Sequence, residues 1–127
     1  MIVQKLRIDK VIDLHESLIK ESGGSTGLRD INLLESALAA PFASFDGVYL
    51  YKTIEEQTAR LVYGIIKNHS FIDENKRIGI LAMLTFLKEN GVLLDCSDEE
   101  LVKLGLSVAD GTSNEKDIME FIISHEI

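Results

Sequence analysis

The stretch HSFIDENKRIGILAMLTFLKENG, residues 69–91, decides the fold of this protein. Its first part is polar, and five consecutive side chains from Asp73 to Arg77 can form hydrogen bonds. The part after Arg77 is almost wholly apolar and ends at Asn90-Gly91, a sequence typical of helix ends because glycine adopts the left-handed conformation without strain. The apolar side chains cover most of the helix circumference, which predicts a helix over residues 75–89 at the centre of a bundle.

The sequence on both sides of this stretch is helical nearly throughout. Apolar residues recur at three- and four-residue spacing in five further segments, and each segment has a helix start or stop signal. Gly23-Gly24 ends the first segment, and the second begins after Asp30 and stops at Pro41. The capping boxes Thr53–Glu56 and Ser97–Glu100 begin the third and fourth segments. Ser113 or Asn114 begins the last one. Asp46-Gly47 separates two short β-prone runs, which predicts a hairpin that lies as a flap on the helical body.

Together these signals predict an all-α protein, a compact bundle of about six helices with a central buried helix and a short β-hairpin flap. The 127 residues suit one domain, and no linker is evident, so we expect a single domain over residues 1–127. Cys96 is the only cysteine, which excludes an internal disulfide and fits a reducing compartment. The longest apolar run is about half of a membrane span and no signal peptide is visible, so we expect a cytoplasmic protein without membrane contact.

The charge balance argues against nucleic acid binding. The sequence carries 21 acidic and 13 basic residues, a formal net charge of −8, and such a surface repels phosphate backbones. Two adjacent cations, Lys76 and Arg77, follow the polar loop. Charge alone leaves two interpretations of this pair open, a solvated helix end or a point that attracts one small anion.

The polar loop leads into the first turn of the central helix. The first backbone N–H groups of a helix have no helical partner and carry partial positive charge, so they attract phosphate. Lys76 and Arg77 would strengthen that attraction. Acidic residues would stabilise a first turn better than two cations, and a local rule broken without structural gain tends to mark a functional site.

Two further side chains of the loop are candidates for chemistry. His69 continues the buried stripe of the preceding helix, so we expect it on the inward side, where imidazole can act as a general base. Asp73 either caps the central helix or binds Mg²⁺ that arrives with a nucleotide phosphate. Zinc is disfavoured because no second histidine or cysteine is near in sequence, and His15 is expected to be a packed, hydrogen-bonded histidine. From spacing alone, a phosphate-handling catalytic loop and a capped loop are equal alternatives.

Residues 69–77 read His-x-Phe-x-Asp-x-Asn-Lys-Arg, which resembles the signature of the Doc branch of the Fic/Doc family, toxins named for death on curing. GLRDINLLESALAAP at residues 27–41, the hairpin after it and LKENGVLL at residues 87–94 resemble Doc-type proteins as well, so the resemblance covers most of the chain. It implies a toxin of a toxin–antitoxin system, with a cognate antitoxin protein as its partner.

Carried over residue by residue, the resemblance implies that His69 takes a proton from the target hydroxyl and that Asp73 binds Mg²⁺. Asn75, Lys76 and Arg77 would hold the phosphate oxygens of ATP, and the hairpin would pair with the target chain as an added strand. In the family the target is a threonine of elongation factor Tu, and its modification arrests translation. The implied activity is therefore a protein kinase that uses ATP and Mg²⁺.

The sequence departs from the broader Fic pattern, His-Pro-Phe-x-Asp/Glu-Gly-Asn-Gly-Arg with a further arginine three residues on. Ser70 replaces the proline, Glu74 and Lys76 replace the two glycines, and Ile80 stands at the position of the second arginine. These departures favour transfer of the γ-phosphate and leave AMP transfer as the alternative enzyme activity. The alternative from another class is a non-catalytic helical interaction module. Glu74 also departs from the small residue common in Doc proteins.

Overall fold

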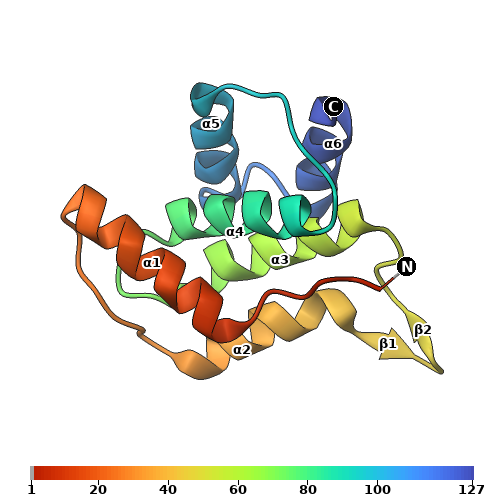
Figure 1. Ribbon diagram of the computed structural model, residues 1–127, viewed down its shortest axis with the longest axis horizontal. Coiled ribbons are helices and arrows are strands. Elements are labelled where there is room, and N and C mark those ends of the chain that lie inside the picture. The colour runs from red at the N-terminus through yellow and green to blue at the C-terminus, as the bar shows by residue number, and fades with distance from the viewer. Residues whose placement is uncertain (1) are drawn as a thin grey trace.

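The computed structural model describes residues 2–127, which form six α-helices, a short 3₁₀ helix and a two-stranded antiparallel hairpin (Figure 1). The elements are α1 (Ile8–Ser22), α2 (Ile31–Ala39), η1 (Ala40–Phe42), β1 (Ser44–Phe45), β2 (Val48–Tyr49), α3 (Ile54–Asn68), α4 (Asn75–Glu89), α5 (Asp98–Ala109) and α6 (Glu115–His125). The predicted all-α bundle of about six helices is confirmed. None of the helices in this range is both long and apolar enough to cross a bilayer.

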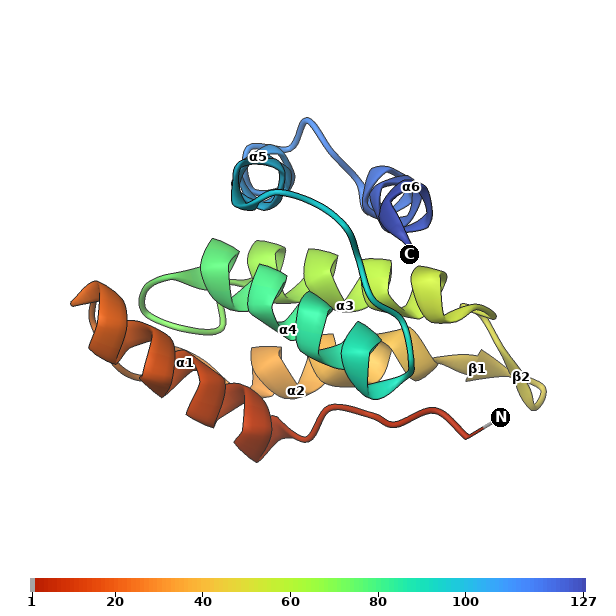
Figure 2. The same ribbon diagram turned by 45° about the horizontal axis from the view of Figure 1, so that its top comes forward.

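The helices form three layers, with α3 and α4 in the middle, α1 and α2 on one side, and α5 and α6 on the other (Figure 2). Two clusters of buried side chains fill the spaces between these layers. Ile78 and Phe86 of α4 belong to the cluster under α1 and α2, whereas Met83 and Leu87 belong to the cluster under α5 and α6. Because α4 contributes to both clusters, the prediction of a central buried helix is confirmed.

The helix starts follow the predicted capping residues. Asp30 accepts hydrogen bonds from two N–H groups of the first turn of α2, and Ser97 and Asn114 begin complete capping boxes at α5 and α6. At α3 the box is only half formed, because the Thr53 hydroxyl accepts from the Glu56 N–H but the Glu56 carboxylate bonds that hydroxyl rather than the Thr53 backbone. These caps explain why the helices begin where the sequence indicates.

The hairpin forms as predicted, but its position differs from the expectation. Asp46 and Gly47 have φ angles of 53° and 78°, as a two-residue turn of this kind requires, and Phe45 pairs with Val48. Phe45 is 78% exposed and the hairpin projects from the body beside the start of α3 (Figures 1 and 2). The expectation of a flap lying on the helical body is therefore wrong, because only Tyr49 meets an aromatic ring of the body, the ring of Phe42.

Candidate functional site

The loop between α3 and α4, residues 69–74, is held by the connection between α1 and α2, residues 23–30. Leu28 and Phe71 form an antiparallel β-bridge, and the Ile72 N–H donates to the Gly27 carbonyl at 3.1 Å. The Ser70 carbonyl accepts from the backbone N–H groups of two residues of the connection, at 2.8 and 3.1 Å. Two chain segments that are far apart in sequence thus fix the backbone of the loop.

The hairpin lies at the other end of α3 from this loop (Figures 1 and 2). A helix of 15 residues, the length of α3, spans roughly 22 Å. The segment that borders the loop is therefore the α1–α2 connection. The expectation that the hairpin pairs with the target chain stays a prediction, and such pairing would take place at the far end of α3 from His69.

His69 is the C-cap residue of α3 and has a left-handed backbone, with φ 50° and ψ 52°. Its side chain is exposed, so the expectation that it lies on the inward side is wrong. The left-handed residue turns the chain away from the helix axis, and the helical period no longer sets the direction of the side chain. Arg29 holds this corner, because its guanidinium donates to the carbonyls of Asn68 and His69 at 2.9 and 2.7 Å. A cation at this position also complements the negative end of the helix dipole.

Asn75 closes the loop on a buried aromatic residue. Its side-chain oxygen accepts from the Phe71 N–H at 3.1 Å and its side-chain nitrogen donates to the Phe71 carbonyl at 3.0 Å. Phe71 is 2% exposed and lies in the core cluster under α1 and α2. Phe71 therefore anchors the loop in the core. Asn75 fixes the loop on it, and one hydrogen of the Asn75 amide is left for a ligand.

Asp73 does not cap α4. The N-cap residue of α4 is Glu74, with φ 64°, and no side chain caps this helix. One carboxylate oxygen of Asp73 accepts from the Glu74 N–H at 2.9 Å and the other accepts from the Ser25 N–H at 3.2 Å. A Cβ atom on Gly24 would lie 2.8 Å from this second oxygen, so a larger residue here would displace the carboxylate. The capping interpretation is therefore wrong, and the half-buried carboxylate faces the α1–α2 connection.

The protein groups around Asp73 fit Mg²⁺ only if substrate phosphates and water supply most of its ligands. Within residues 2–127 no group of three or more His, Cys, Asp or Glu side chains is placed to hold a metal ion. Mg²⁺ is often bound by one or two carboxylates, with the remaining ligands supplied by substrate phosphates and water. Each oxygen of Asp73 accepts a single hydrogen bond and so retains a lone pair for such an ion.

The start of α4 leaves backbone donors free. Among residues 2–127, no acceptor is found for the N–H groups of Asn75, Lys76 and Arg77. Lys76 is exposed and forms no ion pair within the same range, while the Arg77 guanidinium lies 3.0 Å from the Glu74 carboxylate. Three unpartnered N–H groups beside two cations are an arrangement that can attract an anion such as phosphate.

His15, Ser25 and Arg29 contact the loop, and these contacts were not predicted. His15 is 1% exposed and its Nε2 lies 2.8 Å from the Asp73 carbonyl oxygen, so the expectation of a packed, hydrogen-bonded histidine is confirmed. The three residues are 40 to 58 positions from their partners in the loop. Local sequence patterns carry no signal for contacts over such separations.

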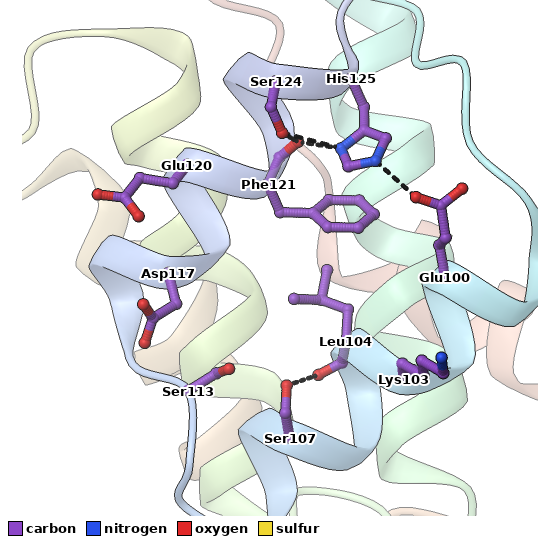
Figure 3. Close-up of a pocket in the computed structure, with 10 residues that line it drawn as sticks. All are labelled: Glu100, Lys103, Leu104, Ser107, Ser113, Asp117, Glu120, Phe121, Ser124 and His125. Atoms are coloured by element: carbon purple, nitrogen blue, oxygen red, sulfur yellow. Dashed lines mark hydrogen bonds and ion pairs between the residues drawn. The ribbon is translucent and has the colours of Figure 1, made fainter.

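A separate groove of about 540 Å³ lies between α5 and α6 (Figure 3). Its floor includes Leu104 and Phe121, and at one end His125 bonds the Glu100 carboxylate at 2.7 Å. The Phe121 carbonyl and the Glu100 carboxylate accept hydrogen bonds from the His125 ring, and these bonds raise the pKa of His125 above its ordinary value. None of the predicted site residues lines this groove, so the candidate site is the loop before α4.

The fold and the loop together define a class: small helical proteins in which a loop with a histidine and an aspartate precedes the start of the central helix, where backbone N–H groups are free and two cations follow. A family model described as the Fic/DOC family matches residues 5–87, which include α1 to most of α4. The chain therefore belongs to the Fic/DOC family, and its motif at residues 69–77 places it in the Doc branch.

A curated relative supports the branch. Toxin Doc of Mycolicibacterium smegmatis (strain ATCC 700084 / mc(2)155) is 40% identical over 72 residues, which are 57% of this chain and 55% of that protein. The match thus spans about half of the length of that relative. The family-model match ends within α4, so α5 and α6 lie outside it.

Proposed function

We propose that this protein is a Doc-type toxin that transfers the γ-phosphate of ATP to a hydroxyl side chain of a protein. We propose a threonine of elongation factor Tu as the target, so that the modification arrests translation. The observation that carries this proposal is the start of α4, where unpartnered N–H groups and two cations lie beside His69 and Asp73. Family membership and the similarity to a protein named Toxin Doc support it.

In this proposal the helix terminus binds the transferred phosphate. The N–H groups of residues 75–77 and the Lys76 ammonium stabilise the charge on its oxygens, which is the main requirement of phosphoryl transfer. Arg77 joins them after its guanidinium exchanges the Glu74 carboxylate for a phosphate oxygen. Asp73 would hold Mg²⁺ together with the phosphates, and the bound ion would supply further charge stabilisation.

His69 acts as the general base. Its ring is exposed while Arg29 fixes its backbone carbonyl, so the imidazole can meet a hydroxyl from outside the protein. The imidazole takes the hydroxyl proton as the oxygen bonds to the γ-phosphorus. The bond between the γ-phosphorus and the β,γ-bridging oxygen breaks, and ADP leaves with the electron pair. The target segment would approach beside the α1–α2 connection, which borders the loop.

The experiment that tests this proposal is incubation with bacterial lysate and ATP labelled in turn at the α- and γ-phosphates. We expect label from the γ position in one acceptor protein, identified by mass spectrometry. His69→Ala should lower the rate by about 10²- to 10⁴-fold, the usual contribution of a general base. Lys76→Ala should also lower it, whereas Lys103→Ala, which removes an exposed lysine of α5, should not. Transfer of α label would establish AMP transfer instead, and no transfer would favour a non-catalytic module.

We also propose an antitoxin protein that covers the loop with an amphipathic helix. Two exposed apolar side chains offer such a helix an apolar contact: Ile72 in the loop, at 59% exposure, and Ile31 at the start of α2, at 47%. Expression in bacteria without a partner should arrest growth, and His69→Ala should relieve the arrest. Free growth with the wild-type protein and no partner would contradict both the toxicity and the need for an antitoxin.

A further inference from the structure

Most of the contacts that orient Asp73 come from outside the motif, and the most buried of them is made by α1. We propose that His15 is a positioning residue for Asp73: its ring fixes the backbone from which the carboxylate projects. This inference rests on the proposed function in one respect, because it takes Asp73 as the metal-binding group. No role in the site was expected for His15 from the sequence.

One ring contacts both ends of the tripeptide that carries the carboxylate. His15 Nε2 lies 2.8 Å from the carbonyl oxygen of Asp73. A carbonyl can only accept, so Nε2 carries the hydrogen and donates it. The same ring stacks on Phe71, with centroids 3.9 Å apart and planes inclined by 16°. His15 and Phe71 are both buried, so the ring holds the two residues on either side of Ile72 against the core.

The carboxylate itself is oriented from the same side of the molecule. Ser25 donates its N–H to one oxygen at 3.2 Å, and the absence of a side chain on Gly24 leaves room for that oxygen. Ser25 lies three residues after the end of α1, so α1 sets the position of both His15 and the Ser25 donor. If the carbonyl bond to His15 is lost, the backbone of Asp73 can shift, and the carboxylate then moves relative to Ser25.

A positioning role and a merely structural role predict different results. A structural residue changes the stability of the whole protein and leaves the folded site unaltered. A positioning residue also changes properties that depend on the direction of one carboxylate. Second-layer hydrogen bonds of this kind typically change metal affinity or activity by about 10- to 100-fold.

Two substitutions separate the two contacts of the ring. His15→Phe keeps an aromatic ring to stack on Phe71 but removes the donor to Asp73. His15→Gln removes the ring but places an amide N–H near the position of Nε2, so it should rescue the hydrogen bond. His125 provides a matched control in α6, since its ring stacks on Phe121 with centroids 4.1 Å apart and bonds the Phe121 carbonyl at 2.7 Å (Figure 3). It lines the groove between α5 and α6, which no residue of the loop lines.

The first measurement needs no metal. Hydrogen exchange of the Ser25 and Glu74 amides, both bonded to the Asp73 carboxylate, is compared with exchange of the core amide of Val62. We expect His15→Phe to accelerate hydrogen exchange of the Ser25 and Glu74 amides by about ten-fold or more relative to exchange of the Val62 amide. In His15→Gln these exchange rates should stay near those of the wild type. His125→Phe should leave this ratio unchanged.

The second measurement is the affinity for Mn²⁺, a paramagnetic substitute for Mg²⁺, in the presence of ATP. His15→Phe should weaken it by about 10- to 100-fold, while His15→Gln and His125→Phe retain it. If both substitutions at His15 leave the exchange ratio and the affinity unchanged, the positioning role is overturned. If the wild type binds no Mn²⁺ with ATP but the exchange ratio still changes in His15→Phe, the positioning of Asp73 stands and the proposed metal-dependent function fails.

Discussion

At the scale of single residues, Glu74 has an unusual backbone for its type. Its φ of 64° is in the left-handed region, which costs an L-residue with a Cβ atom about 1–2 kcal/mol. It directly precedes the anion site, and its carboxylate pairs with Arg77 at 3.0 Å. Glu74 thus combines backbone strain with a local charge that competes for one of the two cations.

The first prediction compares two substitutions at this position. Glu74→Gly and Glu74→Ala both remove the pair with Arg77, but only glycine accepts the left-handed backbone without strain. We expect the Gly variant to be more stable than the Ala variant by about 1 kcal/mol. Urea unfolding at one pH measures the difference. An Ala variant of equal or greater stability would show that the backbone at residue 74 relaxes.

At the scale of helices, two glycines differ in how much space surrounds them: Gly79 of α4 packs closely against α3, whereas Gly105 of α5 does not. A Cβ on Gly79 of α4 would lie 2.5 Å from Cγ1 of the buried Ile66, whereas a Cβ on Gly105 of α5 would meet Ile80 and Lys76 at ordinary contact distances of 3.4 and 3.7 Å. The two glycines lie in helix interiors, where alanine is intrinsically preferred by about 1 kcal/mol.

The second prediction follows from this difference. Gly79→Ala should destabilise the protein by about 1–3 kcal/mol, because overpacking outweighs helix propensity. Gly105→Ala should be neutral or stabilise it by up to about 1 kcal/mol. Thermal unfolding of both variants checks the signs. A stabilised Gly79→Ala protein would mean that α3 and α4 separate more easily than the packing indicates.

The third prediction concerns the hairpin as an element. Gly47 has φ 78° and open space at its Cβ, so Gly47→Ala strains the turn without a clash. Since the hairpin lies at the far end of α3 from the loop, we expect unchanged affinity for ATP and a loss of stability of about 1 kcal/mol. Gly111→Ala, at φ 86° with the same open space, is the matched control. Titration with a fluorescent ATP analogue measures the affinity, and weaker binding in Gly47→Ala alone would place the hairpin at the site.

At the scale of the whole molecule, two groups near the end of α6 link stability to pH. The pKa of Glu126 is raised to about 7. The largest cause is a hydrogen bond with the Glu55 side chain at the start of α3; partial burial and repulsion by the Glu55 charge add to it. The Phe121 carbonyl and Glu100 raise the pKa of His125. Both groups hold a proton more tightly in the folded state than in the unfolded state.

The fourth prediction is the sign of this dependence. The contribution of Glu126 is fully present below about pH 4.5 and is lost as pH rises to about 7. The contribution of His125 is present below about pH 6.5 and is lost as pH rises through its higher folded value. We expect the free energy of unfolding to fall between pH 5 and 8, and Glu126→Gln and His125→Gln each to reduce that fall. A steeper fall in either variant would contradict the assignment.

Local sequence patterns determined the elements and the composition of the site. Caps, turns and apolar spacing act over about four residues, which is why Asp30, Ser97 and the turn at Asp46 could be assigned without a structure. The run of residues 69–77 also lies within one short loop and one helix turn, so its residues meet whatever the rest of the chain does.

The directions in which the side chains of that loop point follow from the tertiary structure alone. His69 points outward because a left-handed residue ends α3, Asp73 faces Ser25 rather than capping α4, and the hairpin lies away from the site. His15 meets Asp73 across 58 residues. Such contacts depend on the packing of α1 against α4, since burial of apolar surface sets which distant segments lie side by side, and no local pattern encodes that choice.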